Sequence, residues 1–379
     1  MNSSDRILFV DHLRGFAVVI MVMGHSIDSV LSLQTRSTDW FRIYDFFRGF
    51  TAPVFLFVSG WTFTVATARR WKDYRRLTPH LASRLTKILL LFVIGYALHM
   101  PFFSFQKILH NTTPIQYGQF FQADVLHCVA ASLLFLHMLI PFFGSMTRFA
   151  QGTLLVALAI ILFTPFVWAT DFAPILSPAL SPYLNQHQLS MFPLFPYASY
   201  LFFGVGAGHY FLKARKENRE HIFFTRLALG AAIVSTTGVF IDSLSLSPYP
   251  PHDFWKTSPM MFAFRSAVVV LLTTAFFRLK NIPESLAWLL GTVGRYSLLV
   301  YTLHIVMVYG SAANSGLTQF IGQTLALPQA FIVGLIVLTI MILLLKGWNY
   351  VCSHHYHHSR SVQAMAATIL LSMFLTLPH

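Results

Sequence analysis

The chain has 379 residues, of which 55% are hydrophobic, 16% are aromatic and only 10% are charged. A soluble domain carries about 25% charged residues, so this composition excludes an ordinary soluble protein and indicates an integral membrane protein with many spans. The net charge of +13 does not indicate a nucleic-acid-binding protein, because the basic residues gather in the connections between apolar segments. The two cysteines, Cys128 and Cys352, predict neither a disulfide framework nor a metal site.

The apolar segments predict an all-α, polytopic membrane helix bundle, since a span needs about 20 apolar residues. The candidate spans are 7–30, 43–66, 82–103, 124–144, 150–170, 191–211, 226–243, 258–277, 286–310, 327–346 and 361–377. This gives ten or eleven transmembrane helices, because the last segment is the least distinct. The first segment lacks a cleavage site after it and is interpreted as an uncleaved helix. Residues 1–379 are interpreted as one integral membrane domain.

The basic residues set the expected orientation. With the N-terminus in the cytoplasm, most of the 26 lysines and arginines fall in cytoplasmic connections. The opposite connections then hold only Arg36, Arg42, Lys107 and Lys256. The positive charge therefore reflects membrane topology.

The first span carries four polar residues on one stripe. Arg14 and His25 are 11 residues apart, so they face within roughly 20° of each other on a helix. Asp11 precedes Arg14 by three residues and Asp28 follows His25 by three. Such groups are costly in hydrocarbon, so the stripe must face protein or water. A neutral histidine beside a carboxylate is a suitable general base, although a structural ion pair with a packed histidine is the alternative interpretation.

Further polar residues fall inside the predicted spans. At the predicted exoplasmic ends these are Asp45, Arg48, Asp124, His127 and Arg265. Each alone is typical of a structural ion pair, but together with His25 they indicate a polar cavity that opens outward. Arg84 and Lys87 begin the third span from the cytosolic side and are suited to binding phosphate. The ninth span holds Arg295, Tyr301 and His304, which we interpret as supporting residues: Arg295 in the cytosolic half and His304 as a core or cavity group at mid-depth.

Three motifs carry a resemblance to a known superfamily. RILFVDHLRGFAVVIMVMGH (residues 6–25) resembles the first helix of the transmembrane acyltransferases, with Arg6, Asp11, Arg14, Gly15 and His25 at its pattern positions. GFTAPVFLFVSG (residues 49–60) is similar to the second helix of the heparan-α-glucosaminide N-acetyltransferase catalytic-domain family, and GRYSLLVYTLH (residues 294–304) resembles a closing motif shared with the acyltransferase-3 family. The lysosomal members place a catalytic histidine after the first helix, whereas residues 26–47 contain none here.

The resemblance implies an enzyme that passes an acyl group, usually acetyl, from cytosolic acyl-CoA to a sugar amine or hydroxyl outside. It implies His25 as the reacting base and Asp11 with Arg14 as a structural pair. Within that scheme we expect Asp28 or Asp45 to orient His25, Arg48 to stabilise the oxyanion, and Arg84, Lys87 and Arg14 to hold the phosphates of CoA. Direct transfer and a covalent acyl-histidine both stay open.

We expect acyl-CoA as a co-substrate, no permanent cofactor, no metal, and no nucleic-acid partner. The bilayer and an extracytoplasmic glycan or small molecule are the expected partners, with a homodimer left open. The expected location is a bacterial cytoplasmic membrane. A proton-coupled transporter that uses the charged residues as a relay is the alternative function, and a non-catalytic scaffold is a third.

Overall fold

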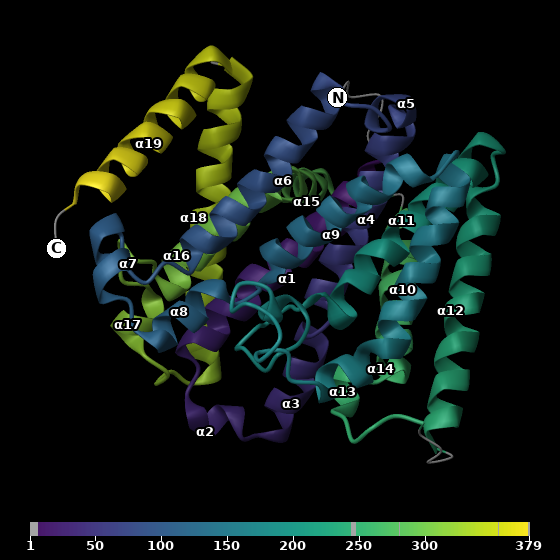
Figure 1. The fold of residues 1–379 in the computed structure, drawn as a ribbon, viewed down its shortest axis with the longest axis horizontal. Coiled ribbons are helices and arrows are strands. Elements are labelled where there is room, and N and C mark those ends of the chain that lie inside the picture. Colours follow the sequence, from purple (N-terminus) through teal and green to yellow (C-terminus); the bar gives the residue numbers. More distant parts are fainter. Residues whose placement is uncertain (1–6, 244–247, 280, 355, 378–379) are drawn as a thin grey trace. The chain divides into compact units, whose positions relative to one another are not determined.

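The computed structural model describes residues 7–243, 248–279, 281–354 and 356–377 (Figure 1). Within these ranges the chain is helical, and its only β-type pairs are two isolated bridges. The prediction of an all-α, polytopic bundle is therefore confirmed. Arg6 of the first motif lies outside the described residues.

The long helices follow the apolar segments. They are α1 (Leu8–Val30), α4 (Thr51–Ala68), α6 (Pro79–Leu98), α9 (Val125–Leu139), α10 (Met146–Ala169), α11 (Leu194–Lys216), α12 (Glu220–Ser243), α14 (Pro259–Arg278), α15 (Glu284–Arg295), α16 (Ser297–Tyr309), α18 (Leu327–His354) and α19 (Tyr356–Thr376). The shorter helices are α2 (Leu33–Arg36), α3 (Asp39–Arg48), α5 (Trp71–Tyr74), α7 (Phe105–Asn111), α8 (Pro114–Phe121), α13 (Phe254–Thr257) and α17 (Leu317–Ile321).

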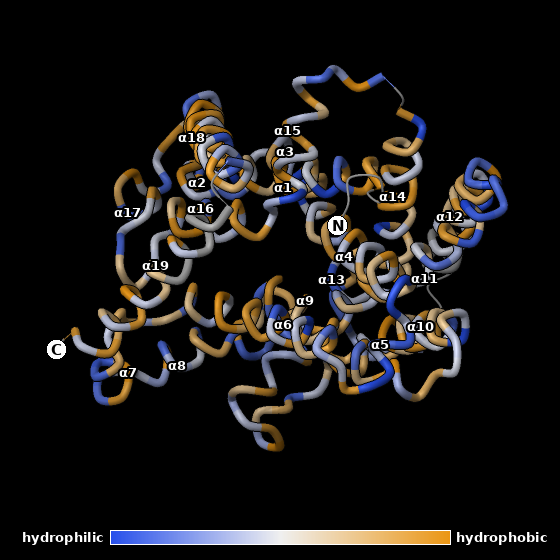
Figure 2. Tube along the Cα trace, turned by 90° about the horizontal axis from the view of Figure 1, so that it is seen from above, coloured by the Kyte–Doolittle hydropathy of each residue, from blue (hydrophilic) through white to orange (hydrophobic). Residues whose placement is uncertain are grey.

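Seven helices of the described chain are long and apolar enough to cross a membrane. Figure 2 shows hydrophobic residues along such helices and hydrophilic residues at many helix ends and connections. The count becomes eight if α15 and α16, which meet at 83°, form one broken span. The structure thus breaks the predicted span 286–310 at Tyr296. The remaining predicted spans coincide with α11, α12 and α19, and the full number of spans stays a prediction.

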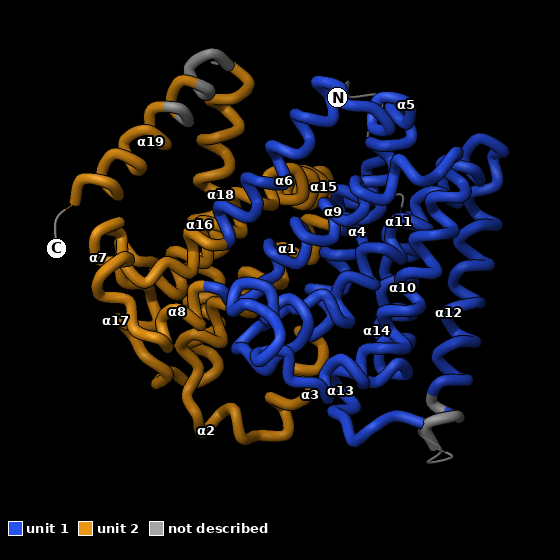
Figure 3. The backbone as a smooth tube through the Cα atoms, viewed as in Figure 1, with its two compact units in different colours: residues 1–13, 49–95, 121–282 blue, residues 14–48, 96–120, 283–379 orange. Residues whose placement is uncertain are grey.

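The chain divides into two compact units (Figure 3). Unit 1 comprises residues 1–13, 49–95 and 121–282, and unit 2 comprises residues 14–48, 96–120 and 283–379. The expectation of one domain over residues 1–379 stays a prediction.

Unit 1 is built on the close approach of α4 to α11. A Cβ atom at Gly60 would collide with the backbone carbonyl of Leu201, and one at Gly204 would collide with that of Phe57. Small residues let membrane helices approach closely where lipid supplies no hydrophobic drive for association. Phe9 adds edge-on contacts with the Trp61 and other aromatic rings beside this crossing. The glycine pair therefore fixes the register of the two helices.

Unit 2 gathers the second half of α1 with α16 and α18. The end of α1 pairs with the chain before α18, where the Leu325 amide donates to Val30 and the Ser32 amide donates to Leu325. Ile27, Val30, Leu31 and Ala330 form a buried apolar cluster at this end. In its first half α1 passes so close to α15 that a Cβ at Gly15 would collide with the backbone of Leu290. These contacts hold α1 against α15 and against the chain around the start of α18.

Candidate functional site

Two histidines from distant parts of the sequence meet in unit 2. His25 lies on α1 and His304 on α16, and Nδ1 of His25 is 3.0 Å from Nε2 of His304. The two rings are nearly parallel, with an interplanar angle of 20°. His304 is completely buried, whereas His25 is half-buried. His25 is therefore the more exposed member of the pair.

The hydrogen bonds around His304 set the proton positions in the pair. Nδ1 of His304 lies 2.8 Å from the carbonyl oxygen of Val300, one turn earlier on α16. A carbonyl only accepts, so this nitrogen carries the proton and donates it. In a neutral ring Nε2 of His304 must then accept, and Nδ1–H of His25 donates to it. The lone pair of His25 is left on Nε2, the nitrogen that faces away from His304.

Aromatic rings cover both histidines. Tyr309, the last residue of α16, approaches the His25 ring with centroids 5.8 Å apart. Tyr301 lies edge-on to His304 at 5.7 Å and is buried. Helix α16 ends at Gly310, whose φ of 81° is a conformation that glycine adopts without strain. This turn sets the position of Tyr309, which is 38% exposed.

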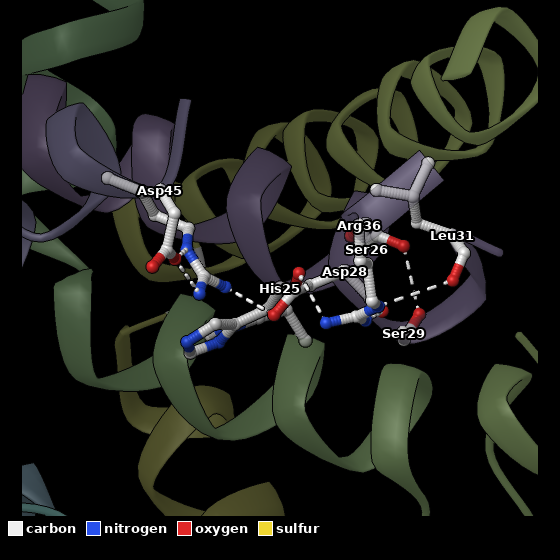
Figure 4. Close-up of polar contacts among 9 residues, drawn as sticks. His25, Ser26, Asp28, Ser29, Leu31, Arg36 and Asp45 are labelled. Atoms are coloured by element: carbon white, nitrogen blue, oxygen red, sulfur yellow. Dashed lines mark hydrogen bonds and ion pairs between the residues drawn. The ribbon is translucent and has the colours of Figure 1, made fainter. Parts of the chain in front are cut away.

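Asp28 forms the centre of a charged network one turn beyond His25. Its carboxylate binds Arg48, and its other oxygen lies 3.3 Å from Nη1 of Arg36. Arg48 also binds Asp45, with Nη2 at 2.5 Å and Nε at 3.2 Å from the same oxygen. In Figure 4 the Arg36 side chain points back toward Asp28 and Leu31. The network contains two positive and two negative groups, so its charges balance.

Helix α1 leaves space for this network at Gly24. A Cβ atom there would lie 3.1 Å from Cδ of Arg48, so the stem of the arginine crosses α1 over the glycine. Three nitrogens of the guanidinium are committed to Asp28 and Asp45. Arg48 is thereby fixed on the helix face next to His25.

The structure brings together several of the predicted residues, but in different pairings. Asp28 or Asp45 was expected to orient His25, whereas both bind Arg48, and the hydrogen-bond partner of His25 is His304. Sequence reasoning gave no site role to Arg36 or Tyr309. The signal that could have identified Arg36 is its position: it is one of the few basic residues in the predicted exoplasmic connections, and it follows Asp28 by eight residues.

Two other predicted residues of unit 2 lie elsewhere. Arg14 is half-buried on α1, and Arg295 is exposed at the end of α15. Because α15 and α16 meet at an angle, Arg295 and His304 do not lie on one continuous helix. Their spacing of nine residues therefore says nothing about a shared face.

Six predicted residues belong to unit 1, and four of them, Asp11, Asp124, His127 and Arg265, are described first. Asp124 is the N-cap of α9: its carboxylate accepts from the His127 amide at 3.0 Å and lies 2.7 Å from Nδ1 of that ring. Both are buried, and the pair closes the helix end as a capping box. Arg265 is half-buried on α14, and Asp11 is half-buried on α1.

Arg84, near the start of α6, is half-buried and surrounded by aromatic rings. Its guanidinium carbon lies 5.0 Å from the ring centre of Tyr74 and 5.5 Å from that of Phe63, and Nη1 is 3.3 Å from the Thr67 hydroxyl. No carboxylate of the described chain lies within ion-pair distance of it. The ring of His137 contacts the same two aromatic residues, and its buried Nε2 has no hydrogen-bond partner in the described structure. Because Nδ1 of His137 lies 2.7 Å from the Leu133 carbonyl and donates to it, Nε2 carries the lone pair of the neutral ring, so the Arg84 guanidinium is the group here that is suited to an anion. Lys87, one turn further along α6, is exposed.

Comparison with known proteins gives a single family assignment. The family model described as an acyltransferase domain, that of the acyltransferase-3 family, matches residues 7–346, which include residues of both units. No curated protein matches the chain. The likeness to the heparan-α-glucosaminide N-acetyltransferase family stays a prediction.

Proposed function

The chain belongs to the acyltransferase-3 family and is a membrane acyltransferase, and we propose that it moves an acetyl group from cytosolic acyl-CoA to a hydroxyl or amine of an extracytoplasmic glycan or small molecule. The observation that carries the proposal is the hydrogen-bond chain from the Val300 carbonyl through His304 to His25. These hydrogen bonds leave the lone pair on Nε2 of His25, the more exposed ring. Acyl transfer to a neutral acceptor requires a group of this kind to take up the proton of the acceptor.

In the proposed reaction Nε2 of His25 removes the proton from the acceptor as the acceptor attacks the thioester carbonyl. A tetrahedral intermediate forms, and its collapse breaks the carbon–sulfur bond. The CoA thiolate then takes the proton back from Nε2 of His25. Throughout, His304 accepts from Nδ1–H of His25 and stabilises the imidazolium that forms, as a carboxylate does in a hydrolase triad.

The charged network supports the reaction from the other side of His25. Asp28 and Asp45 hold Arg48 in place, and we propose that Arg48 stabilises the negative oxygen of the tetrahedral intermediate. Fixed donors are effective in this role because they need no reorganisation as charge develops. Arg36 contributes by holding Asp28.

For the donor we propose that Arg84 binds a phosphate of acyl-CoA, with Lys87 one turn further along α6, and the expectation that Arg14 binds CoA stays a prediction. The support is chemical: Arg84 is a half-buried cation that lies against the rings of Phe63 and Tyr74 and has no carboxylate partner in the described chain. A planar guanidinium stacked on aromatic rings is preorganised to bind phosphate. The basic connections place this end of the bundle in the cytosol, as the positive-inside rule predicts, and a bacterial cytoplasmic membrane is the proposed location.

The test uses purified protein in detergent, radiolabelled acetyl-CoA and a mixed pool of amino sugars and glycans. We compare wild type, His25→Ala and, as a matched control on the same helix, His12→Ala. All three should bind acetyl-CoA, and only His25→Ala should lose turnover, by about 10²- to 10⁴-fold.

Full turnover by a folded His25→Ala protein would refute the role of His25. Binding without transfer in wild type, together with acceptor flux into vesicles, would instead support the proton-coupled transporter. A covalent acyl-histidine would be seen as label that stays on wild-type protein after CoA is removed, and it would replace direct transfer in the scheme above.

A further inference from the structure

A groove lies on unit 1 between the second half of α11 and the first turns of α12. Its volume is about 450 Å³. Helix α10 contributes Leu154 to its lining. The segment of α11 and the turn after it contribute Phe203, Gly206, Ala207, Tyr210, Lys213, Ala214 and Glu217. The start of α12 and the residue before it contribute Arg219, Ile222, Phe223, Arg226 and Leu227. We refer to this groove as the basic groove.

The groove exists because of how the helices are connected and packed. Helix α11 ends in a tight turn at Asn218, whose φ is 54°, and the Arg219 amide donates to the Ala214 carbonyl at 2.8 Å. Helix α12 then packs mainly against α14 and touches α11 much less. On the other side α10 comes so close to α11 that a Cβ at Gly206 would lie 2.5 Å from Cδ2 of Leu154. Leu154 therefore closes the groove on the side of α10, while the space between α11 and α12 stays open.

The two ends of the basic groove differ in polarity. Lys213 and Arg219 lie near the turn, and Arg226 lies two turns into α12. Phe203 is ten residues before Lys213 and so about 15 Å deeper along α11. At the deep end Phe203 offers only apolar surface, and Gly206 and Ala207 continue this surface along α11 toward Tyr210. The groove thus runs from cationic to apolar, which is the order of groups in an amphiphile.

The cations of the groove are not neutralised within the described chain. Lys213 and Arg226 are exposed, and no described carboxylate lies within ion-pair distance of either. Arg219 meets Glu217 at 3.7 Å, and both of these side chains are exposed. One carboxylate therefore faces three cations, so an anionic ligand is favoured.

The surroundings of the groove are apolar and exposed. On α10 the side chains of Leu155 and Leu158 are 68% and 51% exposed, and on α12 those of Leu229 and Ile233 are 61% and 56% exposed. In a membrane protein such faces contact lipid, so the groove opens toward the bilayer. We propose that the basic groove binds an anionic phospholipid, with the phosphate at Lys213 and Arg226 and one acyl chain along Ala207 and Phe203.

The experiment measures lipid binding by the full-length protein. The protein is delipidated in a nonionic detergent, dioleoyl phosphatidylglycerol or dioleoyl phosphatidylcholine is added in mixed micelles, and retained lipid is measured by native mass spectrometry. The wild-type protein should retain more phosphatidylglycerol than phosphatidylcholine. The double variant Lys213→Gln/Arg226→Gln should lose about fivefold in affinity for each charge removed. The matched control is Arg215→Gln/Lys216→Gln, whose residues are exposed at the end of the same helix but do not line the groove.

A second variant tests the shape of the groove. Ala214→Trp fills the space between the helices at their solvent end and should abolish the preference without changing the charge. Equal loss in the two double variants would overturn the proposal, because it would indicate diffuse attraction of anionic lipid. Displacement of the lipid by inorganic phosphate alone would also overturn it, because the site would then recognise a free anion. Melting temperatures in phosphatidylcholine micelles show whether each variant is folded.

Discussion

The sharpest test of the histidine pair is replacement of the buried member, His304→Leu. Leucine fills much of the volume of the ring but cannot accept the hydrogen bond from Nδ1 of His25, which is 3.0 Å from its partner in the wild type. The His25 ring then has no group to select its tautomer or to stabilise its protonated form. Loss of an orienting acceptor of this kind lowers turnover by about 10²- to 10⁴-fold, or about 3 to 5 kcal/mol of transition-state stabilisation.

The same substitution has a separate cost in stability. It leaves a donor of His25 without a partner in a largely buried setting, which costs about 1 to 3 kcal/mol. Activity and stability must therefore be measured together. We expect His304→Leu to melt lower than wild type but to fold, and to lose kcat with little change in KM for acetyl-CoA.

The conservative variant His304→Gln separates orientation from packing. Its side-chain oxygen can accept from His25, so part of the lost turnover should return. Initial rates at saturating acetyl-CoA and acceptor give kcat, and size-exclusion chromatography identifies folded protein. The reasoning is refuted if folded His304→Leu keeps kcat within about threefold of wild type, since an orienting partner cannot be that dispensable.

Three further predictions concern other parts of the chain. Gly60→Ala should destabilise the protein by about 1 to 3 kcal/mol, because the added methyl group collides with the facing backbone of Leu201. Gly230 has open space around it, so the control Gly230→Ala should melt within a few degrees of wild type. Equal melting temperatures for the two variants would contradict the close approach of α4 to α11. Asp28→Asn should lower the free energy of thermal unfolding by about 2 kcal/mol, because two arginines lose a partly buried partner. The control Asp39→Asn breaks only an exposed ion pair and should leave the melting temperature unchanged. An unchanged melting temperature for Asp28→Asn would show that the network is not needed for stability. Arg84→Gln should raise KM for acetyl-CoA by about 10- to 100-fold with kcat nearly unchanged, and an unchanged KM in steady-state kinetics would remove Arg84 from the donor site.

The long helices could be predicted from the sequence because backbone groups in hydrocarbon have few ways to be satisfied. An apolar run such as 327–346 has to be helical, and α18 covers it. The break at Tyr296 could not be predicted in this way, because apolar residues continue on both sides of it and periodicity does not report a bend. The predicted second span, residues 43–66, by contrast lies within one candidate span, Asp39–Ala68, which contains α3 and α4.

For the site, the sequence could identify His25 as unusual but not its partner. Helical periodicity relates residues of one helix, so it pointed to Asp28 and could not reach His304, which is 279 residues away. Long-range pairing is set by packing, here by the approach of α1 to the helices that follow residue 283. Asp124 and His127 show the opposite case, because an aspartate just before an apolar run is also a helix-cap signal, and the structure has them as a cap.

The separation of the two histidines along the chain also determines when the enzyme can become active during its synthesis. Helix α1 emerges from the ribosome first, but its hydrogen-bond acceptor is residue 304 of 379. Until α16 has been made and inserted, His25 has no partner to hold its lone pair on Nε2. On the proposed mechanism a chain that lacks α16 therefore has no oriented base for acyl transfer, even when α1 is already in the membrane.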